Sequence, residues 1–192
     1  MHIGPSLGAA ALSVVALVGG LAPASASTAS SPQPAVARHR HSPTVKLPMQ
    51  LSAPALQRCF PHARASVTVE LTTEKKGFDT VKLHVDHLRA KTTFTVFLIE
   101  QAGAPFGAAE YIGDFTTDRY GHASISYRVI AEEAFAFNNV TKSRTDLNSV
   151  GFWFADPLDD DDCVGAGGQP TGFDGDASAG VQVMNSGATL LP

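Results

Sequence analysis

The chain has 192 residues, 44% of them hydrophobic, and its formal net charge is −4 at pH 7. This composition is that of an ordinary globular protein, and the acidic balance does not supply the basic patch that nucleic-acid phosphates require. Charge is also unevenly distributed, because residues 145–192 contain eight aspartates and no lysine or arginine. We therefore expect one folded domain with an acidic C-terminal end and no nucleic-acid partner.

The N-terminal end has the pattern of an export signal. An apolar run from Leu7 to Leu21 precedes the small residues Ala24-Ser25-Ala26, a typical cleavage site. The run is about fifteen residues long, shorter than a membrane span, and no apolar run of about twenty residues follows it. Residues 1–26 are thus predicted to be a signal peptide, and the mature protein is predicted to be secreted without a transmembrane segment. The alternative is a buried helix of a cytosolic protein, and the absence of lysine and arginine before Leu7 agrees with it.

The next segment, residues 27–55, is rich in serine, proline and alanine and carries the basic stretch Arg38-His39-Arg40-His41. Such a composition buries too little apolar surface to offset the entropy lost on ordering. We expect residues 27–55 to form a disordered linker and residues 56–192 to form a single domain, a monomer.

The two cysteines, Cys59 and Cys163, are expected to form one disulfide, because an exported protein can keep them oxidised. They lie 104 positions apart, so the bond would enclose most of the domain. Neither belongs to a C-x-x-C motif, which favours a structural role over a redox or zinc role.

Five strands are predicted in the first half of the domain from alternating or β-branched apolar residues. A polar turn over 72–77, a turn at 88–91 and a glycine-rich loop over 101–107 separate them. Asp118 and Gly121 suit the outer positions of a type I turn. The predicted strands are Ala65–Leu71, Phe78–Val85, Thr92–Glu100, Glu110–Thr116 and His122–Val129.

In the second half, Ala131–Phe137 has the only helix-like pattern, and Asn138-Asn139 would end it. Two further strands are predicted at Ser149–Ala155 and Ala179–Met184. About seven short strands with regular turns and one short helix predict an antiparallel all-β sandwich.

Three stretches resemble a family of small bacterial extracellular domains with an immunoglobulin-like sandwich. The stretches are Val81-x-Leu83-x-Val85-x-x-Leu88, Thr93-Phe94-Thr95-Val96-Phe97-Leu98 and Gly113-Asp114-Phe115-Thr116-Thr117-Asp118-x-x-Gly121-His122-Ala123. Some members form the outer part of anti-sigma factors. The resemblance implies an immunoglobulin-like fold and a bacterial source. It does not imply the inter-sheet disulfide of antibody domains, because Cys59 and Cys163 are placed differently relative to Trp153. The missing transmembrane helix argues against transferring the regulatory role of anti-sigma factors.

The acidic C-terminal end is a candidate calcium site. Carboxylates on turns that glycine permits can supply the oxygen ligands that calcium prefers, although the spacing is not that of an EF-hand. A solvated acidic loop is the alternative interpretation. The candidate ligands are Asp156, Asp159, Asp161, Asp174 and Asp176.

Histidines and aromatic residues offer two weaker sites. His84 shares a strand face with Asp86, whereas His87 is expected to point the other way, so a zinc or copper site lacks its third ligand. Trp153 lies between Phe152 and Phe154 and takes the opposite strand face. It is either a sugar-stacking platform or part of a central strand covered by the predicted helix.

No established catalytic motif is present: the chain has no Gly-x-Ser-x-Gly, His-Glu-x-x-His or P-loop sequence. Carboxylate pairs for glycoside hydrolysis could come from Glu70, Glu100, Glu110 or Glu133. Asn139-Val140-Thr141 matches a glycosylation sequon. The sequence therefore favours a secreted binding or cell-envelope-associated module without catalytic activity and without a required cofactor. The alternatives are a calcium-stabilised structural domain and a small secreted hydrolase.

Overall fold

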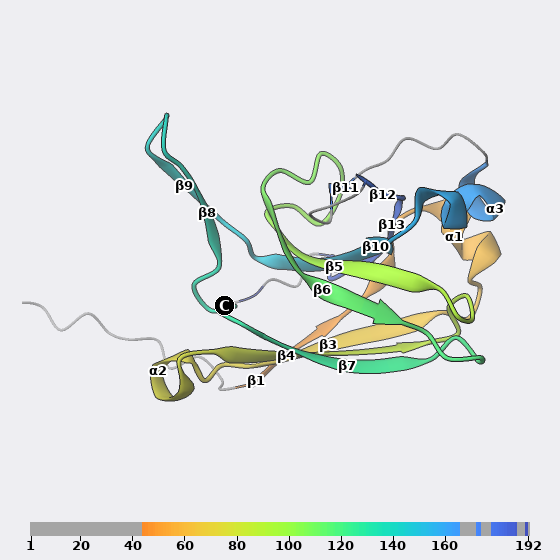
Figure 1. Ribbon diagram of the computed structural model, residues 1–192, viewed down its shortest axis with the longest axis horizontal. Helices are drawn as coiled ribbons and strands as arrows, with labels where there is room; N and C mark the ends of the chain where they lie inside the picture. Colours follow the sequence, from red (N-terminus) through yellow and green to blue (C-terminus); the bar gives the residue numbers. More distant parts are fainter. Residues whose placement is uncertain (1–43, 166–171, 174–177, 188–190, 192) are drawn as a thin grey trace, which may run out of the picture. The chain divides into compact units, whose positions relative to one another are not determined.

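Two antiparallel sheets face each other in the computed structural model, which describes residues 44–165, 172–173, 178–187 and 191 (Figure 1). The first sheet has the order β1 (Thr44–Pro48), β3 (Arg64–Glu70), β4 (Asp79–Asp86) and β7 (Ala123–Val129). The second has the order β2 (Gln50–Leu51), β13 (Gln182–Asn185), β10 (Ser149–Phe154), β5 (Thr93–Ile99) and β6 (Ala109–Thr116). The chain is thus an all-β sandwich, as the strand pattern predicts.

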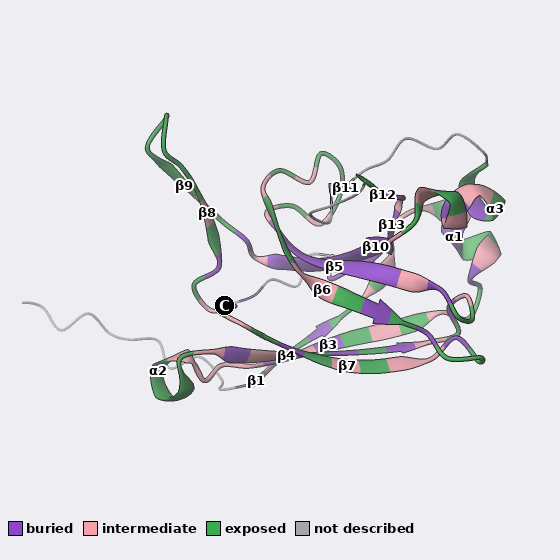
Figure 2. Cartoon of the chain, in the orientation of Figure 1, coloured by how far each residue is buried: buried purple, intermediate pink, exposed green. Residues whose placement is uncertain are grey.

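The core lies between the sheets because each strand directs its apolar face inward. In β4, Val81, Leu83 and Val85 are buried while Lys82 and His84 are exposed. The central strand β10 is buried along its whole length, whereas the outer strands β6 and β7 keep exposed side chains (Figure 2). The alternation of period two therefore reports correctly which face of each strand is buried.

The predicted linker is wrong for residues 44–55. Strand β1 pairs with β3 from Thr44 opposite Glu70 to Pro48 opposite Ser66, and β2 pairs with β13. The short helix α1 (Pro54–Cys59) then buries Leu56 completely. Apolar residues recur at every second position from Val45 to Leu51, which is a strand pattern, and the surrounding prolines and serines conceal it. Pro48 is tolerated because β1 lies at the edge of its sheet.

The predicted helix at Ala131–Phe137 is also wrong. Its second half forms β8 (Phe135–Asn138), which pairs with β9 (Ser143–Asp146) into a two-stranded hairpin. This hairpin, hereafter the arm, stands out from the sandwich (Figure 1). The helix does not form because the backbone groups of its second half pair with β9, from Phe135 opposite Asp146 onward. The N–H groups of Ala131 and Glu132 donate to the carboxylate of Asp79.

The remaining predicted elements are present with small shifts. The predicted turn at Asp118–Gly121 is present, since the Gly121 N–H donates to the Asp118 carbonyl oxygen at 3.1 Å. The last predicted strand lies at β13, three residues later than expected. Short elements complete the described chain: α2 (Thr73–Lys76), the 3-10 helix η1 (Pro157–Asp160), α3 (Asp161–Val164), β11 (Gly172–Phe173) and β12 (Ser178–Ala179).

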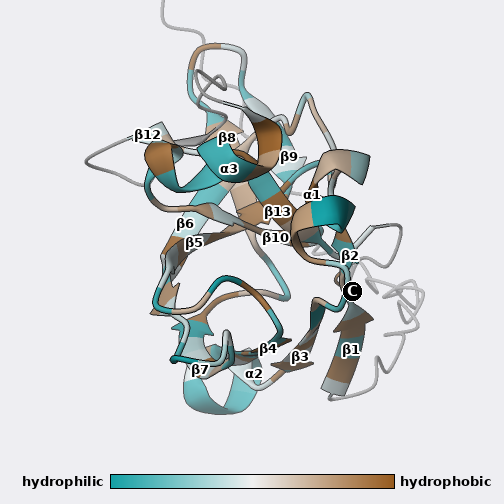
Figure 3. Cartoon of the chain, turned by 90° about the vertical axis from the view of Figure 1, so that its right-hand side faces the viewer, coloured by the Kyte–Doolittle hydropathy of each residue, from teal (hydrophilic) through white to brown (hydrophobic). Residues whose placement is uncertain are grey.

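The disulfide joins Cys59 and Cys163, whose Cα atoms lie 5.6 Å apart, as the sequence predicts. It connects the end of α1 to α3, and these two short helices lie side by side at one end of the sandwich (Figure 3). Within the described part of the chain, no helix is long and apolar enough to cross a membrane.

Candidate binding site

A pocket lies where the arm leaves the sandwich, and it contains two of the four glutamates considered above. Its volume is about 270 Å³. The lining residues come from β6, from the segment after β7 and from the first residue of β8: Glu110, Ile130, Glu133, Ala134 and Phe135.

Apolar side chains surround the two carboxylates. Ile130 and Phe135 are 50% and 46% exposed, which is high for such large apolar groups. Glu110 and Glu133 are also exposed. The pocket therefore offers an apolar wall and two anionic groups to a ligand from solution.

The segment between Ile130 and Glu133 is anchored by Asp79, the first residue of β4, which is completely buried. One carboxylate oxygen accepts the N–H groups of Thr72 and Thr73 at 2.7 and 2.9 Å. The other accepts those of Ala131 and Glu132, both at 2.9 Å. Burial alone would raise the pKa of Asp79, but the hydrogen bonds from Glu132, Thr72 and Thr73 outweigh it and lower the pKa. An ionised Asp79 thus ties the segment below the arm to the β3–β4 connection.

Backbone hydrogen bonds continue this support into the arm. The Ala134 N–H donates to the Ala131 carbonyl oxygen at 3.4 Å, and the Leu147 N–H donates to the Ala134 carbonyl oxygen at 3.0 Å. Ala134 and Leu147 are buried, so the two ends of the arm are held in the core.

Beyond its base, the arm is exposed. The guanidinium of Arg144 stacks over the ring of Phe135 at 4.4 Å and pairs with Asp146 at 2.6 Å. Phe137 is 48% and Val140 91% exposed. Since a two-stranded hairpin is only marginally stable alone, the buried ends and this stacking must support the arm.

The other two glutamates have structural partners. Glu70 pairs with Lys82 across the strands β3 and β4, and this hydrogen bond lowers the pKa of Glu70. Glu100 accepts the N–H of Ala108 at 3.0 Å in the connection between β5 and β6. Of the predicted carboxylate pairs, the pocket therefore contains only that of Glu110 and Glu133.

The aspartates predicted to bind calcium do not converge where the structure describes them. Asp156 caps η1 by accepting the Leu158 N–H at 2.9 Å, while Asp159 and Asp161 lie along η1 and α3. Among the described residues, no group of three histidine, cysteine, aspartate or glutamate side chains could hold a metal ion. Asp174 and Asp176 lie outside the described residues, so the calcium site stays a prediction.

Asp160, which the calcium prediction did not use, is the buried member of this acidic run, at 1% exposure. One of its carboxylate oxygens accepts the Val181 N–H at 2.7 Å, and the other has no hydrogen-bond partner. Burial raises the pKa of Asp160 above its ordinary value. This aspartate therefore joins η1 to the segment before β13.

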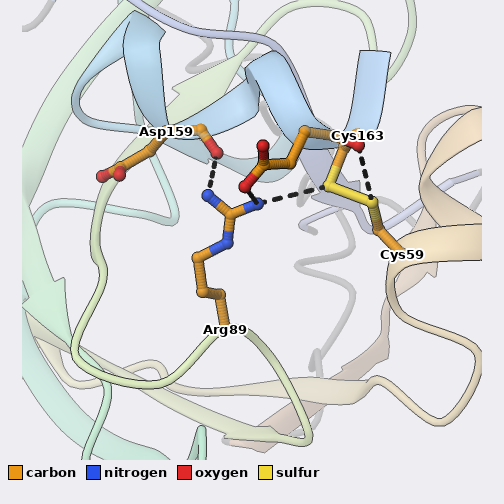
Figure 4. Close-up of a disulfide and its surroundings, with 5 residues drawn as sticks. Cys59, Arg89, Asp159 and Cys163 are labelled. Carbon is orange, nitrogen blue, oxygen red and sulfur yellow. Dashed lines mark hydrogen bonds and ion pairs between the residues drawn. A yellow bond between two sulfur atoms is a disulfide. The ribbon is translucent and has the colours of Figure 1, made fainter. Parts of the chain in front are cut away.

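Arg89 holds the acidic run against the sandwich (Figure 4). Its guanidinium donates to the Asp159 carbonyl oxygen and lies 3.5 Å from the Asp162 carboxylate. It also lies 3.7 Å from the sulfur of Cys163 and 5.6 Å from the ring centre of Phe154. Arg89 thus pairs with one exposed carboxylate of the acidic run, that of Asp162, beside the disulfide.

The prediction of Trp153 as a binding platform is wrong in this structure, because the residue is only 2% exposed. The rings of Phe97 and Phe106 pack edge-on against it, each with its centre 5.1 Å away. The cover of Trp153 therefore comes from β5 and from the β5–β6 connection, and not from the predicted helix.

The structure brings together two histidines from different connections, His87 and His122. His84 pairs with Asp86 at 3.1 Å, as the shared strand face predicts. His87 has a φ of 59°, a left-handed conformation that turns the chain after β4. Its ring centre lies 5.4 Å from that of His122, which follows the β6–β7 turn. No sequence pattern predicts this pair, because it depends on the left-handed backbone conformation of His87.

A comparison of the chain with models of known protein families and with curated proteins found no match.

Proposed function

We propose that this chain is a secreted, non-catalytic binding module of the cell envelope, and that its pocket receives a lysine or arginine side chain of a partner protein. The observation that carries the proposal is the pairing of Glu110 and Glu133 with the exposed apolar groups Ile130 and Phe135. Lysine and arginine combine an apolar stem with a cationic head, which matches this lining. The immunoglobulin-like sandwich and the export signal are parts of the same proposal.

The arm supports the proposal because it adds apolar surface next to the pocket. Phe137 and Val140 are exposed along and at the tip of the arm. Aromatic residues are enriched in the cores of protein–protein interfaces. A partner that inserts a cationic side chain into the pocket would therefore contact the arm with its neighbouring apolar residues.

The test uses a capped Leu-Lys-Leu peptide as probe and the same peptide with norleucine in place of lysine. We expect amide chemical-shift changes in the mature protein to cluster at residues 110, 130 and 133–135 with the lysine peptide only. Glu110→Gln and Glu133→Gln should each weaken binding several-fold, because an exposed ion pair contributes about 0.2–1 kcal/mol. Asp114→Asn is the matched control, since Asp114 is another exposed carboxylate of β6 that does not line the pocket. Equal shifts with both peptides, or none at millimolar peptide, would refute the proposal.

The same two carboxylates support a second candidate, a small secreted glycoside hydrolase. Such enzymes place two carboxyl groups on either side of the scissile bond, and Glu110 and Glu133 share one pocket. Hydrolysis of aryl glycosides that is lost in both Glu110→Gln and Glu133→Gln would establish this alternative and overturn the non-catalytic assignment.

A further inference from the structure

We propose that His87 and His122 form a binding site for one divalent transition-metal ion, with water as the remaining ligands. The two imidazoles come from different connections, one after β4 and one after the turn that follows β6. Imidazole nitrogen suits zinc, nickel and copper, and the copper(II) ion is expected to bind most tightly.

The separation of the two rings fits a shared ion. A zinc–nitrogen bond of about 2.0–2.1 Å places each ring centre about 3.2 Å from the metal. At a tetrahedral angle of about 109°, two such rings would have centres about 5.2 Å apart. The observed separation is 5.4 Å, with the ring planes at 67°. Rotation about χ2, which is a soft torsion, changes the direction of the nitrogens of each ring while the backbone stays in place.

The backbone around the pair is already fixed, so little ordering is needed on binding. The Leu88 N–H donates to the Gly121 carbonyl oxygen, and the Lys91 N–H donates to the Asp118 carbonyl oxygen, both at 3.1 Å. The backbone N–H of His122 donates to the side-chain carboxylate of Asp118 at 2.9 Å. These bonds hold the β4–β5 and β6–β7 connections together directly beside the two rings.

The surroundings leave the pair accessible. His87 is exposed and His122 half-buried, so water can complete the coordination. Arg119, the nearest cation in sequence to His122, stacks over the ring of Tyr120 at 4.7 Å. Within the described segments, no third histidine, cysteine, aspartate or glutamate side chain lies close enough to complete a three-ligand site. The site is therefore an open one with two protein ligands.

The test is a titration of the mature protein with zinc(II), the ion whose tetrahedral geometry matches the ring separation, at neutral pH. We expect one zinc per chain by calorimetry, perturbed ring signals of His87 and His122 in nuclear magnetic resonance spectra, and a higher melting temperature because the ion binds the native state and joins two connections. His87→Ala and His122→Ala should each weaken this binding by at least tenfold and remove the thermal shift.

His84→Ala is the matched control, because His84 is an exposed histidine of the adjoining strand and lies outside the pair. His39→Ala with His41→Ala controls for the basic stretch near the N-terminus, whose histidines could bind zinc independently. Binding that survives both His87→Ala and His122→Ala, or that disappears with either control, would overturn the proposal. The proposed function does not depend on this result.

Discussion

Replacing Asp79 by asparagine should be among the most damaging single changes in this protein. The carboxylate is completely buried and accepts four backbone N–H groups, two before β4 and two after β7. Asparagine keeps one acceptor oxygen and turns an NH₂ donor toward the other two N–H groups. Two hydrogen bonds to a charged acceptor are lost, at about 1.5–3 kcal/mol each. We expect the free energy of unfolding to fall by about 3–5 kcal/mol.

The loss should depend on pH in a defined direction. Because the native state lowers the pKa of Asp79, its stabilising contribution is complete above the unfolded pKa of about 3.9. It disappears as the pH falls through the lower native value. The asparagine variant does not titrate there, so the difference between the two proteins should be largest near pH 7 and shrink below about pH 4.

Urea denaturation of both proteins between pH 7 and pH 2.5 measures this difference directly. Asp114→Asn serves as the control, since an exposed carboxylate should change the free energy by no more than about 0.5 kcal/mol. A difference for Asp79→Asn below about 1 kcal/mol at pH 7, or one that is the same at pH 7 and pH 3, would refute the assignment of Asp79 as an ionised anchor.

Three further outcomes are expected. Gly121→Ala should lower the melting temperature by several degrees, because Gly121 has a φ of 77° and a Cβ there would lie 2.0 Å from the Leu88 carbonyl oxygen. An unchanged melting temperature would contradict this close packing. Replacing both Cys59 and Cys163 by serine should cost about 4–5 kcal/mol in urea denaturation, since the bond closes a loop of 104 residues; a loss under 1 kcal/mol would show that the bond is dispensable. The emission of Trp153, the only tryptophan, should be blue-shifted in the native protein and insensitive to soluble sugars, because the ring is buried; quenching by a sugar would restore the platform hypothesis.

The sequence predicts the sandwich well wherever burial on one face determines the strand. The alternation of apolar and polar residues in β3, β4 and β7 predicts an inner and an outer face for each strand. The continuous apolar run of β10 predicts a central strand. The disulfide is predictable for a different reason, since two cysteines allow only one pairing within the chain.

The sequence fails where a tertiary contact overrides a local preference. Ala131–Phe137 has good helix formers, yet its second half pairs with β9, from Phe135 opposite Asp146 to Asn138 opposite Ser143. Likewise, the burial of Trp153 depends on the position of Phe106 in a loop, and the contact of His87 with His122 depends on one left-handed residue. None of these contacts leaves a periodic trace in the sequence.

The pairing of β8 with β9 also shapes the candidate pocket. A helix over Ala131–Phe137 would place Glu133 and Phe135 on its own regular surface, whereas the segment forms a turn that Asp79 anchors and that continues into the arm. Glu133 and Phe135 thereby meet Glu110 of β6, the edge strand of the other sheet. The Asp79→Asn variant consequently links stability to binding: if it still folds, it should bind the Leu-Lys-Leu peptide more weakly, although Asp79 does not line the pocket. Unimpaired binding by a folded but destabilised variant would show that the pocket forms without this anchor.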